Sequence, residues 1–519
     1  MPRFPTATKS AAKGAAILAA ATLILSGCAA GAQAGGDTEP VTLNWSFSLP
    51  TSWDPVTSST GNDINTLSLV YASITQLDEK GDVIPGLAES WKYNDTGDAV
   101  TFTLRPGLTF TDGTKLDAQA VKDSITRGQT QDDSLITSQL AEIQDITVED
   151  ALNVTLHLSK VDYQLPYVLA GRNGEIVSPT AAANDASALP TNPVGAGPFK
   201  FESFVPESEA VLVKNPDYWR ADEIHIDTLN LTVAADPSTV VQAVQSGSID
   251  VATLDPSQID QAKSAGLTVE VIKSLSVNAL NINNTIAPFT DPAVIKAIRY
   301  GINRQELVDT LTYGTGSVSY QPFPEGYAAY NKDLENLYPY DPAKAKKILA
   351  DAGYKDGDVT FAITTFSFTE AYAQLLQAQL AKIGITTTID IVPAGSSTWQ
   401  QKVYLDGRSA QLATDGTVGR ESPVANLEAT IGPLGLMNAS RSATPEFIAA
   451  LDEVRATPLD DPHYNEVLQN AVKIGVLQEI NIPTYTSARV LVHSSVVSAL
   501  PHYLSQVRWE GVTVDRSGN

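Results

Sequence analysis

Residues 77–126 read LDEKGDVIPGLAESWKYNDTGDAVTFTLRPGLTFTDGTKLDAQAVKDSIT, and this stretch decides the fold. Within it, residues 99–104 (AVTFTL) alternate apolar and polar side chains, which predicts a strand with one buried face. Asp112 and Gly113 form a turn signal. Trp91 and Phe102 are expected in the core. The stretch therefore predicts antiparallel strands joined by tight turns.

Outward from this stretch, strand and helix signals alternate along the chain. Residues 41–47 and 153–158 repeat the period-two pattern of a half-buried strand. Asp291-Pro292 predicts a helix start, because Asp caps the first turn and Pro fits the first helical position. The same rules predict a helix from Asp341-Pro342 to Gly353, a helix over 371–383 closed by Gly384, and a strand over 386–392. The class is α/β with mixed sheets.

The N-terminus has the pattern of an export signal. Arg3, Lys9 and Lys13 precede an apolar run, 14–25, that is too short for a permanent membrane span of about 20 residues. Leu25-Ser26-Gly27-Cys28 resembles the bacterial lipobox, in which the cysteine thiol is lipidated. We expect residues 1–27 to be a signal peptide and 28–40 a tether anchored to the cell membrane by lipid on Cys28, with the body outside the cytoplasm.

The composition excludes several classes of protein. The chain has 34 basic and 59 acidic residues, a net charge of −25, which argues against binding to nucleic acid. The single cysteine leaves no internal disulfide. At 519 residues the chain exceeds what one core usually organises, so two or three lobes are expected.

Motifs for catalysis are missing from the sequence. It contains no GxGxxG, GxxxxGK[ST] or GxSxG pattern, and its five histidines are isolated, without HExxH or HxH spacing. We therefore expect no enzyme activity, no cofactor and no metal site.

Three long blocks carry a family resemblance. The first is 77–126. The second contains PVGAGPFKFESF (193–204), KNPDYW (214–219) and QSGSIDVA (245–252), and the third contains LNINN (280–284), DPAVIKAIRYGINRQELV (291–308) and YDPAKAKKILADAGY (340–354). In this order they resemble the family 5 extracellular solute-binding proteins of dipeptide, oligopeptide and nickel ABC importers.

The resemblance implies a two-lobed periplasmic-binding-protein-like fold of type II, with an extra inserted domain and a hinge between the lobes. The expected parts are lobe I (41–59, 191–275 and 486–519), inserted domain II (60–190) and lobe III (276–485), with chain crossings near 275–281 and 482–486. It also implies a monomer that closes on a ligand between its lobes and delivers it to ABC permease subunits.

The resemblance places ligand contacts in loops that follow strands. The expected binding residues are Phe47, Trp53, Phe366, Trp399, Asp415, Gly416 and Arg420. Peptide-binding members carry a Gly-Trp-x-x-Asp stretch whose Asp binds the peptide amine. Alignment on Pro423 and Leu427 puts Gly416 at the Trp and Gly419 at the Asp. Asp415 takes the amine role only after a slip in register, and Arg420 would pair with a carboxylate or phosphate.

Several ligands therefore stay open at this point. A peptide is the default for the family, while an oligosaccharide, an opine-like compound or a metal chelate needs no amine contact. A surface signalling receptor on the same fold is a further alternative.

Changing Cys28 to Ala is expected to abolish lipidation, because the thiol is the acceptor. Mass spectrometry should find a diacylglyceryl adduct on the wild-type chain and on the control Ser26→Ala, which keeps a small residue before the cut. An adduct on the Cys28→Ala chain would contradict the anchor.

Overall fold

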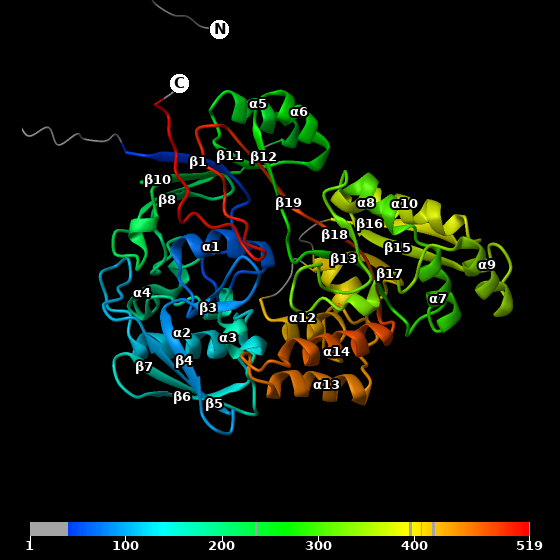
Figure 1. Ribbon diagram of the computed structural model, residues 1–519, viewed down its shortest axis with the longest axis horizontal. Coiled ribbons are helices and arrows are strands. Elements are labelled where there is room, and N and C mark those ends of the chain that lie inside the picture. The colour runs from blue at the N-terminus through cyan, green and yellow to red at the C-terminus, as the bar shows by residue number, and fades with distance from the viewer. Residues whose placement is uncertain (1–39, 234–235, 394–396, 406, 418–420, 518–519) are drawn as a thin grey trace, which may run out of the picture. The chain divides into compact units, whose positions relative to one another are not determined.

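The computed structural model describes residues 40–233, 236–393, 397–405, 407–417 and 421–517. The described chain has two large mixed sheets, a four-stranded antiparallel sheet and a two-stranded ribbon, with helices packed around them (Figure 1). This is the α/β architecture with mixed sheets that the sequence predicts. Cys28 and the predicted signal peptide lie outside the described residues.

The seven-stranded sheet is assembled from three distant parts of the chain. Its order is β12-β19-β11-β1-β10-β9-β8. The strands are β1 (Thr42–Ser46), β8 (Phe199–Val205), β9 (Glu209–Lys214), β10 (Thr228–Thr232), β11 (Val251–Thr253), β12 (Thr268–Ile272) and β19 (Arg489–His493). All of them fall in the ranges predicted for lobe I. The core beneath includes Leu43, Trp45, Phe199 and Leu229, which have no exposed surface.

One buried carboxylate connects the three parts of this sheet. Asp250 directly precedes β11, and its Oδ2 accepts hydrogen bonds from the Asn44 amide at 2.7 Å, from Asn44 Nδ2 at 3.2 Å and from Arg516 Nη2 at 2.8 Å. The Asp250 side chain is fully buried. We call this set the Asp250 contact. It ties the first strand and the C-terminal tail to the middle of the chain.

The six-stranded sheet comes from the later half of the chain. Its order is β14-β18-β13-β17-β15-β16. The strands are β13 (Val277–Ile282), β14 (Ser317–Val318), β15 (Thr360–Phe366), β16 (Thr386–Val392), β17 (Leu412–Thr417) and β18 (Asn481–Thr486). Helix α10 (Glu370–Ala381) packs on β15 and β16, and α8 (Arg304–Leu311) packs on β18. Except for Thr486, every residue of these strands lies in the range predicted for lobe III.

The predicted inserted range contains its own sheet and core. The four-stranded sheet has the order β4-β5-β7-β6, from β4 (Ala88–Tyr93), β5 (Ala99–Leu104), β6 (Ile143–Val148) and β7 (Asn153–Leu158), and the ribbon pairs β2 (Thr75–Leu77) with β3 (Val83–Pro85). Helix α2 (Ala118–Thr130) covers one face. Phe102 is buried there, as predicted, and so is Phe110, whereas Trp91 is only half-buried.

Helix boundaries follow their caps. Asp291 and Asp341 accept from backbone amides at the starts of α7 (Pro292–Gly301) and α9 (Pro342–Asp351), and Gly353 has φ +92° after α9. These starts and the strand over 386–392 are confirmed. The remaining helices are α1 (Ile64–Val70), α3 (Leu165–Val168), α4 (Pro179–Asp185), α5 (Val240–Gln245), α6 (Ile259–Ser264), α11 (Ser397–Trp399), α12 (Pro423–Thr430), α13 (Pro445–Ala456) and α14 (Tyr464–Leu477).

The chain passes between the two large sheets twice, at 273–276 and at 487–488. The predicted crossings, 275–281 and 482–486, mostly lie inside β13 and β18, so the crossings are shorter than expected. The two segments bind one another: Ser274 Oγ donates to the Ser487 carbonyl at 2.6 Å, and the Ser487 amide donates to the Ser276 carbonyl at 3.2 Å. Asn278 Nδ2 of β13 also donates to Ser487 Oγ, at 2.8 Å.

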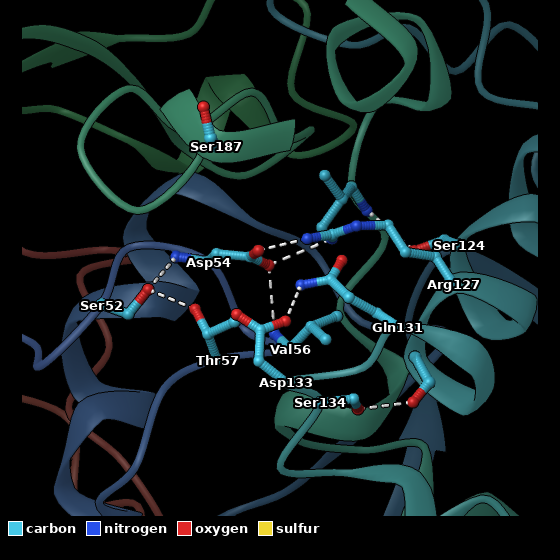
Figure 2. Close-up of polar contacts among 12 residues, drawn as sticks. Ser52, Asp54, Val56, Thr57, Ser124, Arg127, Gln131, Asp133, Ser134 and Ser187 are labelled. Atoms are coloured by element: carbon cyan, nitrogen blue, oxygen red, sulfur yellow. Dashed lines mark hydrogen bonds and ion pairs between the residues drawn. The ribbon is translucent and has the colours of Figure 1, made fainter. Parts of the chain in front are cut away.

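A buried ion pair holds the loop that follows β1 (Figure 2). Asp54 accepts from Arg127 Nη1 of α2 at 3.1 Å and forms a second, shorter contact with Nη2. The side chain of Asp54 is 1% exposed and that of Arg127 is 13% exposed. Asp54 Oδ1 also accepts from the Val56 amide at 3.1 Å. The pair therefore fastens the chain after the first strand to the inserted range.

Replacing Asp54 with Ala is expected to lower the free energy of unfolding by about 3–5 kcal/mol, because the buried Arg127 loses its partner. The double variant Asp54→Ala/Arg127→Met removes both charges and should be less destabilised than Asp54→Ala alone. Urea unfolding measures both. The single variant Arg127→Met is measured as well. A loss of unfolding free energy in the double variant equal to the sum of the losses in the two single variants would contradict a role for charge burial.

Candidate functional site

The carboxyl ends of three parallel strands share one edge of the six-stranded sheet. Strand β15 runs parallel to β16 and β17, so the three strands end at the same edge of the sheet. Their last residues are Phe366, Val392 and Thr417. Val277, the first residue of β13, pairs with Thr417 and Thr486. Both crossing segments therefore leave from this edge, which faces the seven-stranded sheet. Ligands of α/β proteins bind outside such carboxyl ends.

The seven-stranded sheet presents its own carboxyl ends to the same crossings. Strand β1 is parallel to β10 and β11 and ends at Ser46. Ile272, the last residue of β12 before the first crossing, pairs with Arg489, the first residue of β19 after the second crossing. Phe47 follows β1 directly, and its amide donates to the Thr232 carbonyl at 3.0 Å. A solute held between these two edges would contact both sheets.

An aromatic stack stands at the edge of the six-stranded sheet. The rings of Phe366 and Trp399 have centroids 3.8 Å apart at 24°, and Phe366 and Phe368 have centroids 5.1 Å apart at 9°. Trp399 is 3% exposed and packs with Val392 and Val403, whereas Phe368 is 71% exposed. We call these three rings the aromatic stack. It runs from a buried indole to a phenyl ring in solvent.

A carboxylate lies beside the buried end of the stack. Asp415 Oδ2 accepts from Tyr404 Oη at 2.6 Å and from Asn281 Nδ2 at 2.9 Å, while Oδ1 accepts from the Gly416 amide at 2.8 Å. Burial raises the pKa of Asp415 to about 6, although these three hydrogen bonds favour the ionised form. At neutral pH the site therefore holds a half-buried negative charge.

A π-helical turn, η10 (Gln400–Tyr404), brings Tyr404 to Asp415. The ring of Tyr404 packs edge-on against Trp399, with centroids 6.2 Å apart. The π-helical hydrogen-bonding pattern is rare and occurs frequently at functional sites. The turn therefore couples the aromatic stack to the carboxylate.

Two polar atoms on the strands around this carboxylate, one on β13 and one on β17, have no partner. Asn281 Oδ1 and Thr417 Oγ1 are buried and form no hydrogen bond within the described chain. Buried polar atoms are usually paired, so such exceptions call for an explanation. Asn281 contacts Asp415, so an unpartnered amide oxygen beside an anionic oxygen suits a ligand group that donates hydrogen bonds.

The structure brings together four of the predicted binding residues: Phe366, Trp399, Asp415 and Gly416. Phe47 lies at the edge of the other sheet, where it stacks on Trp45 with centroids 4.5 Å apart. Trp53 has no exposed surface and packs edge-on against Phe201, so its placement is that of a core residue. Arg420 lies outside the described residues.

Sequence reasoning missed Tyr404 and Asn281. Asn281 is a polar residue in the otherwise largely apolar strand β13 (VNALNI), which could have marked it as a binding residue. Tyr404 gave no comparable signal, because only the π-helical turn brings it to Asp415. Among the described residues, no three His, Cys, Asp or Glu side chains gather as metal ligands would, and no helix has the length and apolar character needed to span a bilayer.

Residues 82–425 match the family model of the bacterial extracellular solute-binding proteins, family 5, middle region. The chain belongs to this family. Members are solute-binding proteins, and the two-lobed fold described above agrees with that membership. The prediction of the family is confirmed.

Relatives of this family 5 protein bind different solutes. The glutathione-binding protein GsiB of Salmonella paratyphi A is 30% identical over 330 residues, which cover 63% of this chain and 64% of that protein. Heme-binding protein A of Haemophilus influenzae is 25% identical over 492 residues, 85% of this chain and 88% of that protein. DppA from Helicobacter pylori, solved with the peptide STSA, superposes with a TM-score of 0.79 at 22% identity over 92% of this chain and 98% of its own.

Asp415→Asn is expected to raise the unfolding temperature at pH 8 and to change it little at pH 4. The pKa of Asp415 is about 6 in the folded chain, above the ordinary value of about 3.9. The folded state therefore holds the proton more tightly, and stability is lost as the pH rises through 6. Circular dichroism melts measure this. The exposed control Asp145→Asn should show no such pH dependence, and an equal gain at both pH values would contradict the assignment.

Proposed function

We propose that this protein is the substrate-binding lipoprotein of an ABC importer, which captures a peptide or a similar small solute between its lobes and delivers it to the permease. The observation that carries the proposal is the half-buried Asp415 carboxylate, which lies at the edge of the six-stranded sheet from which both crossings leave. Family membership supports solute binding, and the absence of catalytic motifs from the sequence agrees with a role in capture.

Asp415 supplies the charge that recognises an amine. With a pKa near 6, it is mostly ionised at pH 7 and can pair with the ammonium group of a peptide N-terminus. Asn281, whose Nδ2 donates to Asp415, adds its unpartnered Oδ1 as an acceptor for a second ammonium hydrogen. The ammonium group would take the place of water beside Asp415, where leaving the carboxylate charge unpaired is costly.

Ligand binding is proposed to favour a closed arrangement of the lobes. A solute held by Asp415 on one sheet and by the loop after β1 on the other gains its full set of contacts only when both edges approach. Such a ligand shifts the population toward the closed form. The segments 273–276 and 487–488 would act as the hinge, between the proposed lobe I (41–59, 191–275 and 486–519) and lobe III (276–485), with 60–190 as the inserted domain.

The partners follow from this role. The closed form would dock on ABC permease subunits as a monomer, and lipid on Cys28, with residues 28–40 as a tether, would keep it at the outer face of the cell membrane. This anchor rests on the Leu-Ser-Gly-Cys sequence at 25–28.

A free amino terminus on the ligand is expected to matter. Isothermal titration should find that wild-type protein binds the tripeptide Ala-Ala-Ala at least about tenfold more tightly than its N-acetylated form, because the acetyl group removes the charge that pairs with Asp415. Asp415→Asn should bind both forms equally weakly, and Asp145→Asn should behave as wild type. Equal affinity of the wild-type protein for both forms would contradict the amine role.

A further inference from the structure

Phe368 differs from the other exposed apolar side chains in the described chain. Exposed residues such as Tyr313, at 59%, and Tyr340, at 38%, stand alone, whereas Phe368, at 71%, ends the aromatic stack. Phe366 covers one face of its ring at 9°. Phe368 is absent from the cluster that buries Trp399. Its ring therefore extends an ordered stack into solvent without contributing to the core.

The turn that carries Phe368 is fixed by hydrogen bonds. Thr369 Oγ1 lies 2.9 Å from Thr365 Oγ1 and accepts from the Phe366 amide at 3.2 Å, and Thr365 Oγ1 in turn lies 2.6 Å from Thr414 Oγ1 of β17. Phe368 is thus tied through β15 to the strand that bears Asp415. These bonds order the turn, and stacking on Phe366 orders the ring itself, so Phe368 loses less freedom when a ligand stacks on it.

The position of Phe368 connects it with the proposed solute site. It follows β15 at the edge from which both crossings leave, and the stack leads through Phe366 and Trp399 to Tyr404, which binds Asp415. Aromatic rings favour offset stacking on a further flat ring. An exposed ring at the end of such a stack can take one more member.

We infer that the ligand class of this protein combines an amine with a flat, ring-bearing group, and that Phe368 is the residue that selects the ring. The inference rests on the proposed solute capture and adds the class of solute. The amine pairs with Asp415, and the ring stacks on the solvent face of Phe368 when the lobes close.

Paired tripeptides test this inference. The affinities of Ala-Ala-Ala, Phe-Ala-Ala, Ala-Phe-Ala and Ala-Ala-Phe are measured by isothermal titration for wild type, Phe368→Ala and Phe368→Leu. Leucine keeps an apolar side chain and removes the flat ring. Since Phe368 is exposed, neither variant should fail to fold, and thermal melts verify this.

At least one Phe-containing peptide should bind wild type about tenfold more tightly than Ala-Ala-Ala, the scale of one aromatic pair with its buried area. Phe368→Ala should remove that preference and leave Ala-Ala-Ala within about twofold of wild type. Phe368→Leu should keep only part of it.

Other outcomes overturn the inference in distinguishable ways. If wild type binds Ala-Ala-Ala and the Phe peptides equally, or Phe368→Ala weakens all of them equally, ring selection is wrong while peptide capture stands. If Phe368→Ala leaves every affinity unchanged but slows uptake by cells, Phe368 contacts a partner protein instead. If wild type binds none of the peptides, the proposed peptide capture fails and this inference fails with it.

Discussion

The buried carboxylate of Asp250 holds the seven-stranded sheet together. Asp250 accepts three hydrogen bonds, two from Asn44 in the first strand and one from Arg516 near the end of the chain. Without these bonds the charge would be costly to bury, so the three segments are required together. The seven-stranded sheet can therefore be completed only when the C-terminal tail is in place. Asp250 fixes strand β1 through Asn44. The loop that follows β1 carries both Phe47 and Asp54.

The arrangement of strands explains why the candidate site lies where it does. Each large sheet ends its parallel strands at the edge where the chain crosses to the other sheet, so both sets of carboxyl ends lie toward one another. Asp415 occupies this edge although burial raises its pKa and its ionisation costs stability. A carboxylate such as Asp415, which weakens the fold and lies beside a stack of aromatic rings, is typical of a binding site.

Much of the fold could be predicted from sequence, because local patterns determined it. Residues 99–104 and 153–158 form strands β5 and β7 with those bounds, and Asp291 and Asp341 cap helices. The positions predicted for the crossings were partly wrong, because strands β13 and β18 continue almost to the crossings themselves. Trp53 shows the limit for sites: an aromatic residue in a loop has the same sequence signature in a core as in a binding site. The contact between Tyr404 and Asp415 depends on a π-helical turn, which no periodicity reveals.

The two crossing segments are bonded to each other through Ser274 and Ser487, and Asn278 of β13 adds a bond to Ser487. Two independent linkers would let the sheets swing, slide and twist separately. Linkers that are joined side by side behave as one short ribbon, which bends readily about a line across its width and resists torsion. Any opening and shutting about these segments would then have essentially one degree of freedom, so the same pair of surfaces would meet each time.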